Sequence, residues 1–264
     1  MINKDKELRE LYARLDDLRD LCERGEIGVS QFLTEAEHAR ADAYLKRSGL
    51  NSFFFGGYSD AERTRLYVLP DYMEGEGVGV IEDYGYSLQI KALCVRGSGY
   101  SKLTHRDFLG SLLSLGIERA VIGDIAVSED GHSATVFCDE RISPFICSSL
   151  ERVGGDKVAI KELDIRELDE SKLPKRRFAP INTTVSSARL DCVVSALCNL
   201  SRERASELIA AGLVELDFEI EQRPDRKLTP PCVMSVRGFG KYRVLSVDTP
   251  TKKGRYRLEA KKYL

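Results

Sequence analysis

The feature that most constrains the fold is a regular alternation of strand and helix patterns between residues 87 and 163. Alternating apolar residues predict strands, and apolar residues spaced three or four apart predict helices. The expected segments, in order, are Ser87–Val95 (strand), Thr104–Leu115 (helix), Ala120–Val127 and Ser133–Cys138 (strands), Ile142–Val153 (helix) and Lys157–Leu163 (strand). This βαββαβ order is the split βαβ arrangement of ferredoxin-like folds, which RNA-recognition (RRM) domains share. We therefore expect an RRM-like domain over residues 81–165.

Residues 1–80 are expected to form a helical and β region. Helical apolar stripes cover residues 3–24 and 30–47, and Arg65–Leu69 has the composition of a strand. The glycines between residues 75 and 79 have the spacing G-x-G-x-G, which differs from the dinucleotide-binding fingerprint. This segment is predicted to form a flexible hairpin.

The end of the chain shows two short helical patterns, Arg189–Leu200 and Arg202–Ala211. Ser201 is placed to cap the second helix, and Gly212 suits the left-handed position that ends it. The apolar residues of both segments fall on one side, which predicts a compact helix pair. Three arginines then point outward near the helix starts, where they can hold phosphate: Arg189, Arg202 and Arg204.

These patterns divide the chain into an α+β protein of several parts. Residues 166–184 are polar and contain two prolines, and they are expected to be a linker. Residues 185–264 are expected to form a small αL-type RNA-binding domain with two helices and a short β-sheet. A chain of 264 residues is long enough for two modest domains.

Charge is distributed unevenly along the chain. Residues 172–264 contain 19 Lys and Arg against 10 Asp and Glu, a net charge of +9, whereas residues 1–171 contain 21 against 32, a net of −11. A basic part beside an acidic part is typical of a nucleic-acid-binding module joined to something else.

Composition also limits cofactors and location. The seven cysteines form no CxxC pair and the three histidines stand apart, so no metal site or other cofactor is expected. Dispersed cysteines suit a reducing compartment, and no apolar stretch is long enough to cross a membrane. We expect a cytoplasmic protein that does not contact membranes.

The C-terminal segment resembles the RNA-binding domain first known from ribosomal protein S-four of the small subunit. The matching positions are R-L-D at 189–191, S-R and A at 201, 202 and 205, L-I at 208–209, G at 212 and V at 214. Two loops depart from the pattern. Val214–Phe218 replaces the usual V-N-G, and Pro230-Pro231-Cys232 replaces a G-D turn.

Further motifs in the same order resemble the YlmH family of bacterial proteins over most of residues 50–245. They are Phe55–Arg63 (F-G-G-Y-x-x-A-E-R), Leu103–Gly110, Leu115–Ile117, Ile122–Ile125 and Ser235–Tyr242 (S-x-R-G-x-G-K). The resemblance implies an RRM-like domain followed by a basic RNA-binding domain. It also implies association with ribosomes or transfer RNA and a role in rescuing obstructed large ribosomal subunits.

The residues and the resemblance together predict a protein that binds structured RNA and takes no small-molecule substrate. The resemblance implies that this RNA is ribosomal or transfer RNA on the large ribosomal subunit. The phosphate-binding residues expected in the C-terminal domain are Arg189, Arg202, Arg204, Arg237 and Lys241, with Ser201 at the helix start. The basic run Lys175, Arg176 and Arg177 is expected to extend this footprint, and His105 and Arg106 to add a secondary contact.

Three other functions fit the residues less well. His105-Arg106-Asp107 is not a kinase loop, because Leu112 stands where that motif needs an asparagine. A pseudouridine-synthase-like enzyme needs an aspartate in an R-L-D context, and the R-L-D at 189–191 belongs to the helix motif. A cell-division or assembly interaction protein has only weak support, from the acidic first half. The RRM-like region lacks the aromatic signature that stacks bases, so any RNA binding by this region is expected to depend on charge or shape. Its acidic charge suits contact with a protein equally well.

Overall fold

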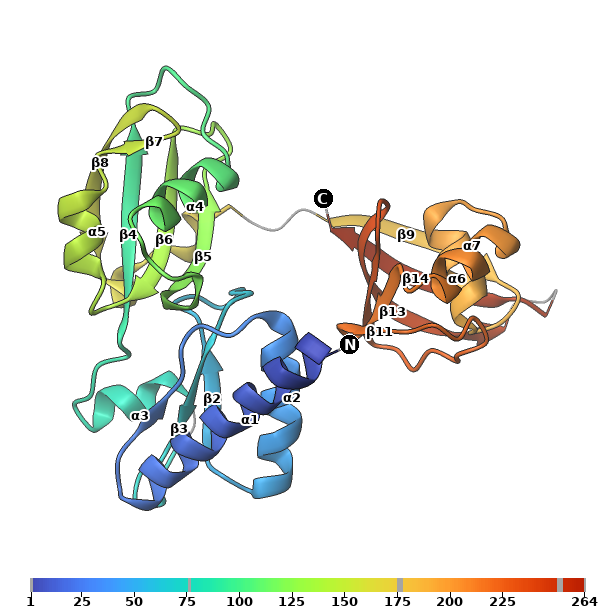
Figure 1. The fold of residues 1–264 in the computed structure, drawn as a ribbon, viewed down its shortest axis with the longest axis horizontal. Coiled ribbons are helices and arrows are strands. Elements are labelled where there is room, and N and C mark those ends of the chain that lie inside the picture. Colours follow the sequence, from blue (N-terminus) through green and yellow to red (C-terminus); the bar gives the residue numbers. More distant parts are fainter. Residues whose placement is uncertain (1, 76, 175–177, 251–253, 264) are drawn as a thin grey trace. The chain divides into compact units, whose positions relative to one another are not determined.

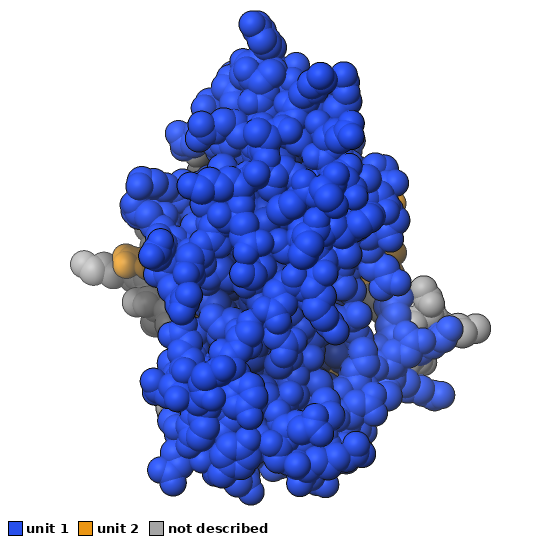
Figure 2. All heavy atoms as spheres, turned by 90° about the vertical axis from the view of Figure 1, so that its left-hand side faces the viewer, with its two compact units in different colours: residues 1–174 blue, residues 175–264 orange. Residues whose placement is uncertain are grey.

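The computed structural model describes residues 2–75, 77–174, 178–250 and 254–263. In these residues it is a mixed α+β structure with seven α-helices and three antiparallel sheets, in agreement with the expected α+β class. The chain divides into two compact units, residues 1–174 and 175–264 (Figures 1 and 2). Of the helices described, none has the length and apolar character needed to span a membrane.

The first part of unit 1 packs two helices on a small sheet. Its elements are α1 (Ile2–Glu23), β1 (Gly28–Val29), α2 (Glu35–Ser48), β2 (Ser52–Phe55), β3 (Arg65–Val68) and α3 (Val78–Asp83), with the strand order β1-β3-β2. Thr34 and Glu37 form a capping box at the start of α2, and Gly49 ends that helix in the left-handed conformation. Apolar side chains of both helices form a core with β3, for example Leu15, Leu45 and Leu66.

The glycine-rich segment does not form the hairpin that the sequence predicts. Helix α3 begins directly after Gly77. Val80 and Ile81 are buried in it and pack against Tyr67 and Met73. Burying two large aliphatic side chains outweighs the roughly 1 kcal/mol that a helical glycine costs, and this explains the difference.

The second part of unit 1 is a five-stranded antiparallel sheet in the order β5-β6-β4-β8-β7. Its elements are β4 (Ile90–Gly97), α4 (His105–Ser114), the 3₁₀ turn η1 (Arg119–Val121), β5 (Ile122–Val127), β6 (Ser133–Asp139), α5 (Ser143–Ser149), β7 (Arg152–Val153) and β8 (Asp156–Leu163). Apart from the short β7, this succession is the split βαβ order. Helices α4 and α5 cover one face of the sheet through Phe108, Leu112 and Ile146 (Figure 1).

Helix α5 is shorter than the expected Ile142–Val153. It ends at Ser149, because Val153 is buried as part of the two-residue strand β7, which pairs with β8. Gly154 and Gly155 make the turn between these strands with positive φ angles of 55° and 88°. The double glycine therefore marks a hairpin where the apolar spacing predicts more helix.

The linker expected over residues 166–184 is instead divided between the two units. Two 3₁₀ turns, η2 (Ile165–Glu167) and η3 (Glu170–Lys172), carry Leu168 and Leu173 onto the first unit, where Leu173 is buried. The other end forms strand β9 (Phe178–Val185), which pairs with the last strand along its whole length. The sequence did not predict the 3₁₀ turns or strand β9, because both segments are mostly polar and bury few apolar side chains.

Unit 2 is a six-stranded antiparallel sheet in the order β11-β10-β12-β13-β14-β9, larger than the short sheet expected. Its remaining elements are α6 (Leu190–Cys198), α7 (Arg202–Ala210), β10 (Val214–Leu216), β11 (Glu219–Ile220), β12 (Cys232–Val236), β13 (Gly240–Pro250) and β14 (Tyr256–Tyr263). The predicted helix pair is confirmed. Val193, Leu208 and Ile209 are buried with Met234 and Tyr242 of the sheet.

Candidate nucleic-acid interface

The starts of α6 and α7 are organised around one buried carboxylate. Asp191, in the first turn of α6, is only 3% exposed. Arg189 donates two hydrogen bonds to its two oxygens, Nε at 3.0 Å and Nη2 at 3.1 Å. Arg202, at the start of α7, donates from Nη2 at 2.6 Å, and the backbone N–H of Cys192 donates at 2.9 Å. One carboxylate thus holds two arginines where the helix starts meet.

The charges at this point reinforce one another. Burial disfavours the charged form of Asp191 and so raises its pKa. The hydrogen bonds from Arg202 and Arg189 favour the charged form more strongly, and the pKa therefore lies below its ordinary value. The hydrogen bond to Asp191 also raises the pKa of Arg202. The side chains of Arg189 and Arg202 remain 40% and 55% exposed. Because a guanidinium has five N–H donors in a fixed fork, each can also bond a phosphate oxygen.

A loop between β11 and β12 lies against the start of α6. The backbone N–H of Leu190 donates to the Arg226 carbonyl at 2.8 Å, and that of Asp191 donates to the Pro224 carbonyl at 3.0 Å. Lys227 pairs with Arg189 as an isolated β-bridge. This loop therefore brings its own basic residues to the two arginines of the helix starts.

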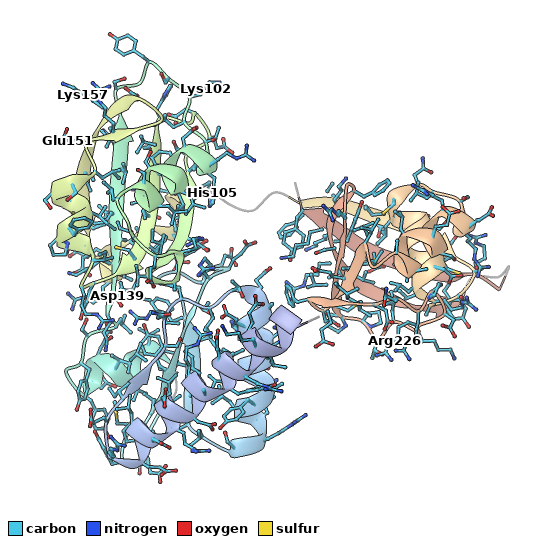
Figure 3. All side chains as sticks on the ribbon, in the orientation of Figure 1. Lys102, His105, Asp139, Glu151, Lys157 and Arg226 are labelled. Atoms are coloured by element: carbon cyan, nitrogen blue, oxygen red, sulfur yellow. The ribbon has the colours of Figure 1, made fainter. Side chains whose placement is uncertain are left out.

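The basic residues of this loop are exposed, and sequence reasoning missed them. Arg223 bonds Glu221 through Nε at 3.1 Å, Arg226 lies 3.8 Å from the same carboxylate, and their side chains are 65% and 49% exposed. The run R-P-D-R-K at 223–227 was the available signal, but its proline and aspartate indicate only a turn. We define the helix-start patch as Arg189, Arg202, Arg223, Arg226 and Lys227, and Figure 3 labels Arg226.

Ser201 and Arg204 have more local roles. The Ser201 hydroxyl accepts a hydrogen bond from the backbone N–H of Arg204 at 3.1 Å, which confirms the predicted cap of α7. The Arg204 guanidinium bonds Glu207 at 2.6 Å, with both side chains more than half exposed. Residues two positions apart on a helix face different sides, so Arg204 does not join Arg202 at Asp191.

Arg237 and Lys241 lie elsewhere in unit 2. Arg237 is exposed in the hairpin between β12 and β13, where its backbone N–H donates to the Leu213 carbonyl at 2.9 Å. The Lys241 ammonium lies over the rings of Phe218 and Tyr263, at 5.4 Å and 4.8 Å from their centres. The predicted residues Lys175, Arg176 and Arg177 lie outside the described residues.

His105 and Arg106 are exposed in the first turn of α4, in unit 1. The predicted capping box of Thr104 and Asp107 is confirmed there. Desolvation lowers the pKa of His105, and the positive charge of Arg119 lowers it further. The lowered pKa favours the neutral imidazole, and Arg106 supplies positive charge at this helix start.

The sheet face of the RRM-like region is partly covered. Phe32 and Leu173 pack on Ala92 and Phe137, on the side away from α4 and α5. The rest of this face opens into a cavity of about 510 Å³ with mixed charges, lined among others by Arg96, Thr135, Lys161, Glu167 and Lys172. No aromatic side chain is among the described residues that line it. Base stacking in the manner of an RRM therefore has no support on this face.

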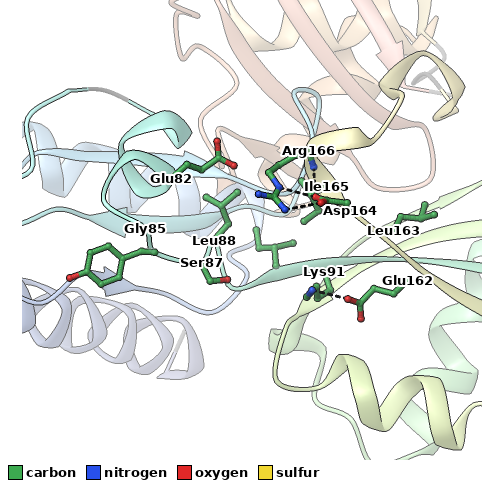
Figure 4. Close-up of a pocket in the computed structure, with 12 residues that line it drawn as sticks. Glu82, Gly85, Ser87, Leu88, Lys91, Glu162, Leu163, Asp164, Ile165 and Arg166 are labelled. Carbon is green, nitrogen blue, oxygen red and sulfur yellow. Dashed lines mark hydrogen bonds and ion pairs between the residues drawn. The ribbon is translucent and has the colours of Figure 1, made fainter.

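A second cavity in unit 1, of about 610 Å³, lies beside the end of β8 (Figure 4). Four of the five charged side chains that line it form two ion pairs, and the fifth, Glu82, is acidic. Lys91 bonds Glu162 at 2.7 Å, and Arg166 bonds Asp164 at 2.8 Å. These charges neutralise each other, so the cavity has no excess positive charge for phosphate.

Two of the motifs that resemble the YlmH family meet inside unit 1. Asp124 accepts hydrogen bonds from the Tyr58 hydroxyl at 2.7 Å and from the backbone N–H groups of Glu62 and Arg63 at 2.7 Å and 3.0 Å. A Cβ added to Gly57 would lie 2.4 Å from the Phe137 ring. These residues therefore join the two parts of the unit and form no exposed site.

Comparison with known proteins agrees with this architecture. The family model described as "Putative RNA-binding domain in YlmH" matches residues 83–167. Over 241 residues the chain is 27% identical to a Bacillus subtilis (strain 168) protein named "Ribosome-associated protein quality control protein P2", covering 91% of this chain and 89% of that protein. A solved structure, "Cell division protein ylmH from Streptococcus pneumoniae", aligns with a TM-score of 0.50 at 20% identity, over 63% of this chain and 94% of that chain.

At 20% identity, the structural likeness shows the fold alone. The fold and the family model together define an α+β protein, one domain of which matches the model described as a putative RNA-binding domain. Residues 83–167 therefore match a family model from YlmH, and the chain is similar to the Bacillus subtilis protein over most of its length.

Proposed function

We propose that this protein binds structured RNA, ribosomal or transfer RNA on the large ribosomal subunit, and acts in ribosome-associated quality control. The observation that carries the proposal is the helix-start patch. It presents two arginines fixed by a buried carboxylate and three more basic residues from the adjoining loop. The similarity to the Bacillus subtilis protein, whose name refers to ribosome-associated quality control, supports the same function.

The patch suits RNA phosphates for two physical reasons. Guanidinium groups held in place by Asp191 lose little side-chain freedom when they bind a phosphate, so less entropy opposes binding. The unit around them is also basic, with 18 Lys and Arg against 10 Asp and Glu in residues 175–264. A net positive unit attracts a polyanion before contact is made.

Arg204, Arg237, Arg106 and the run from Lys175 to Arg177 are proposed as additional phosphate contacts, with His105 beside Arg106. Two RNA-binding surfaces joined in one chain raise each other's effective concentration, so that two weak contacts can act as one stronger one.

The proposal is a binding role and not catalysis. The sequence R-L-D at 189–191 is the context that a pseudouridine-synthase-like mechanism needs. Its carboxylate is 3% exposed and accepts hydrogen bonds from Arg189, Arg202 and Cys192. A carboxylate with its oxygens occupied in this way cannot reach a base in a bound RNA.

Co-sedimentation with ribosomes at several salt concentrations tests the proposal. The variant Arg223→Ala/Arg226→Ala/Lys227→Ala removes three charges of the patch and leaves Asp191 with both arginine partners. The matched control, Arg40→Ala/Lys46→Ala/Arg47→Ala, removes three charges from α2. We expect wild type and control to travel with the large subunit at low salt.

The patch variant should dissociate at a lower salt concentration. When log affinity is plotted against log salt concentration, the slope for this variant should be shallower by about 0.7 to 0.9 for each phosphate that it no longer neutralises. Equal weakening in the patch variant and the control, or unchanged binding of the patch variant, would show that the patch does not hold RNA.

A further inference from the structure

The sheet of unit 2 has a second face, on the side opposite α6 and α7. Side chains alternate between the two faces of a strand. Tyr242, Val244 and Ala260 are buried beneath the helices, so their neighbours Arg243 and Lys261 point to the other side. Arg243 and Lys261 lie directly opposite each other on β13 and β14, and both are exposed.

This face combines aromatic rings with lysines. Tyr263 of β14 lies opposite Phe178 of β9, with the ring centres 5.0 Å apart in an edge-to-face arrangement. Lys241 lies over Tyr263 at 4.8 Å and over Phe218 at 5.4 Å, and Lys261 lies over Phe178 at 5.6 Å. The three rings are only partly buried. We call Phe178, Phe218, Lys241, Arg243, Lys261 and Tyr263 the cation–aromatic face.

The charge of this face favours an anionic partner. By strand register it also carries Arg257, Glu215 and Glu259, so its four cations face two carboxylates. The three rings are not among the buried core residues described for this unit, which lie on the helix side. Partly exposed rings interleaved with cations are the combination that stacks bases and neutralises phosphates in proteins that bind single strands.

We propose that the cation–aromatic face binds single-stranded RNA, with bases stacked on Phe178 and Tyr263 and phosphates held by Lys241, Arg243 and Lys261. Each nucleotide of a single strand offers one flat base and one phosphate, which match both kinds of side chain. An acidic peptide matches the cations alone. The site is separate from the helix-start patch and recognises a different form of RNA.

The chain has no tryptophan, which permits a direct test. In full-length Tyr263→Trp, the new indole is the only tryptophan and lies on the cation–aromatic face. We expect short oligouridine to quench its fluorescence in a saturable way. An abasic oligonucleotide of equal length should quench much less, because it has phosphates but no bases. Phe145→Trp, at an exposed position on α5, is the control that oligouridine should leave unchanged.

Three outcomes would overturn the proposal. They are no quenching by oligouridine, equal quenching by the abasic strand, and equal quenching by polyglutamate. The last would make the face a peptide site. A second variant, Phe178→Leu/Lys241→Gln, keeps an apolar side chain on β9 and should bind labelled oligouridine about tenfold more weakly in fluorescence anisotropy. Unchanged affinity of this variant would also contradict the proposal.

The two RNA sites can be tested separately. The variant Arg223→Ala/Arg226→Ala/Lys227→Ala should keep its affinity for oligouridine within about twofold while binding ribosomes more weakly, and Phe178→Leu/Lys241→Gln should show the reverse preference. Failure of the first variant to bind oligouridine, with the second unaffected, would assign single strands to the helix-start patch and refute the cation–aromatic face.

Discussion

Asp191 shows how one buried residue can order the surface that we propose to bind RNA. It lies in the segment that resembles the S-four domain, where its neighbours Arg189 and Arg202 are the obvious candidates for RNA contact. In the structure both arginines depend on Asp191, because its buried carboxylate fixes the position of both guanidinium groups. The arginines therefore point where they do because of an acidic residue that RNA itself would repel.

We expect Asp191→Asn to lower the free energy of unfolding of unit 2 by about 2 kcal/mol at neutral pH, because an amide cannot replace a charged acceptor for two arginines. Because its folded pKa lies below the ordinary 3.8, the stabilising effect of the carboxylate is complete above that value and is lost as pH falls through the folded pKa. Urea unfolding at neutral and acid pH should show the gap between wild type and variant shrinking below about pH 4. The exposed Asp225→Asn is the control, and an equal loss of stability there would contradict this role.

At the scale of elements, the turn before β3 and the start of β5 hold the two parts of unit 1 together. Gly57 has a φ of 103°, and a Cβ there would collide with Phe137 of β6. Gly110, inside α4, has no atom within 4 Å of its added Cβ and no positive φ. An alanine side chain would therefore clash at Gly57 but have free space at Gly110.

Gly57→Ala should destabilise unit 1 by roughly 3 kcal/mol, since it adds both backbone strain and a clash. Gly110→Ala should instead stabilise it by about 0.5–1 kcal/mol, because alanine is the better helix former. Thermal unfolding of both variants checks this pair. A Gly57→Ala protein as stable as wild type would show that the turn is free to move.

The sequence predicted the elements whose stabilising contacts are made between residues close together in the chain. The caps at Thr104 and Ser201 involve residues three positions apart and were readable directly. Strand β9 was missed because its partner is β14, where Phe178 meets Tyr263 from the far end of the chain. The loop from Arg223 to Lys227 was missed for the same reason, since only backbone hydrogen bonds to α6 bring it to the patch.

At the scale of the whole molecule, the two units have separate cores and opposite charge. The core of unit 2 contains Val193, Ile209 and Tyr242, while the cores of unit 1 include Leu66 and Phe108. Residues 1–174 contain 22 Lys and Arg against 32 Asp and Glu, the reverse of the basic second unit. We expect the acidic unit to limit non-specific binding of the basic unit to RNA.

Separate cores predict two unfolding transitions in calorimetry. Asp191→Asn should lower the midpoint of one transition by several degrees, and Gly57→Ala should lower that of the other. One cooperative transition that both substitutions shift equally would mean that the units unfold together.

The most direct test of the central claim is to ask which residues touch RNA in a ribosome-bound protein. A photocrosslinking amino acid would replace Lys227 in the helix-start patch and, in a second protein, Lys46 at the end of α2. RNA binding through the patch predicts crosslinks to ribosomal or transfer RNA from position 227 and none from position 46. Crosslinks from position 46 alone, or none from 227 in a protein that still travels with ribosomes, would contradict it.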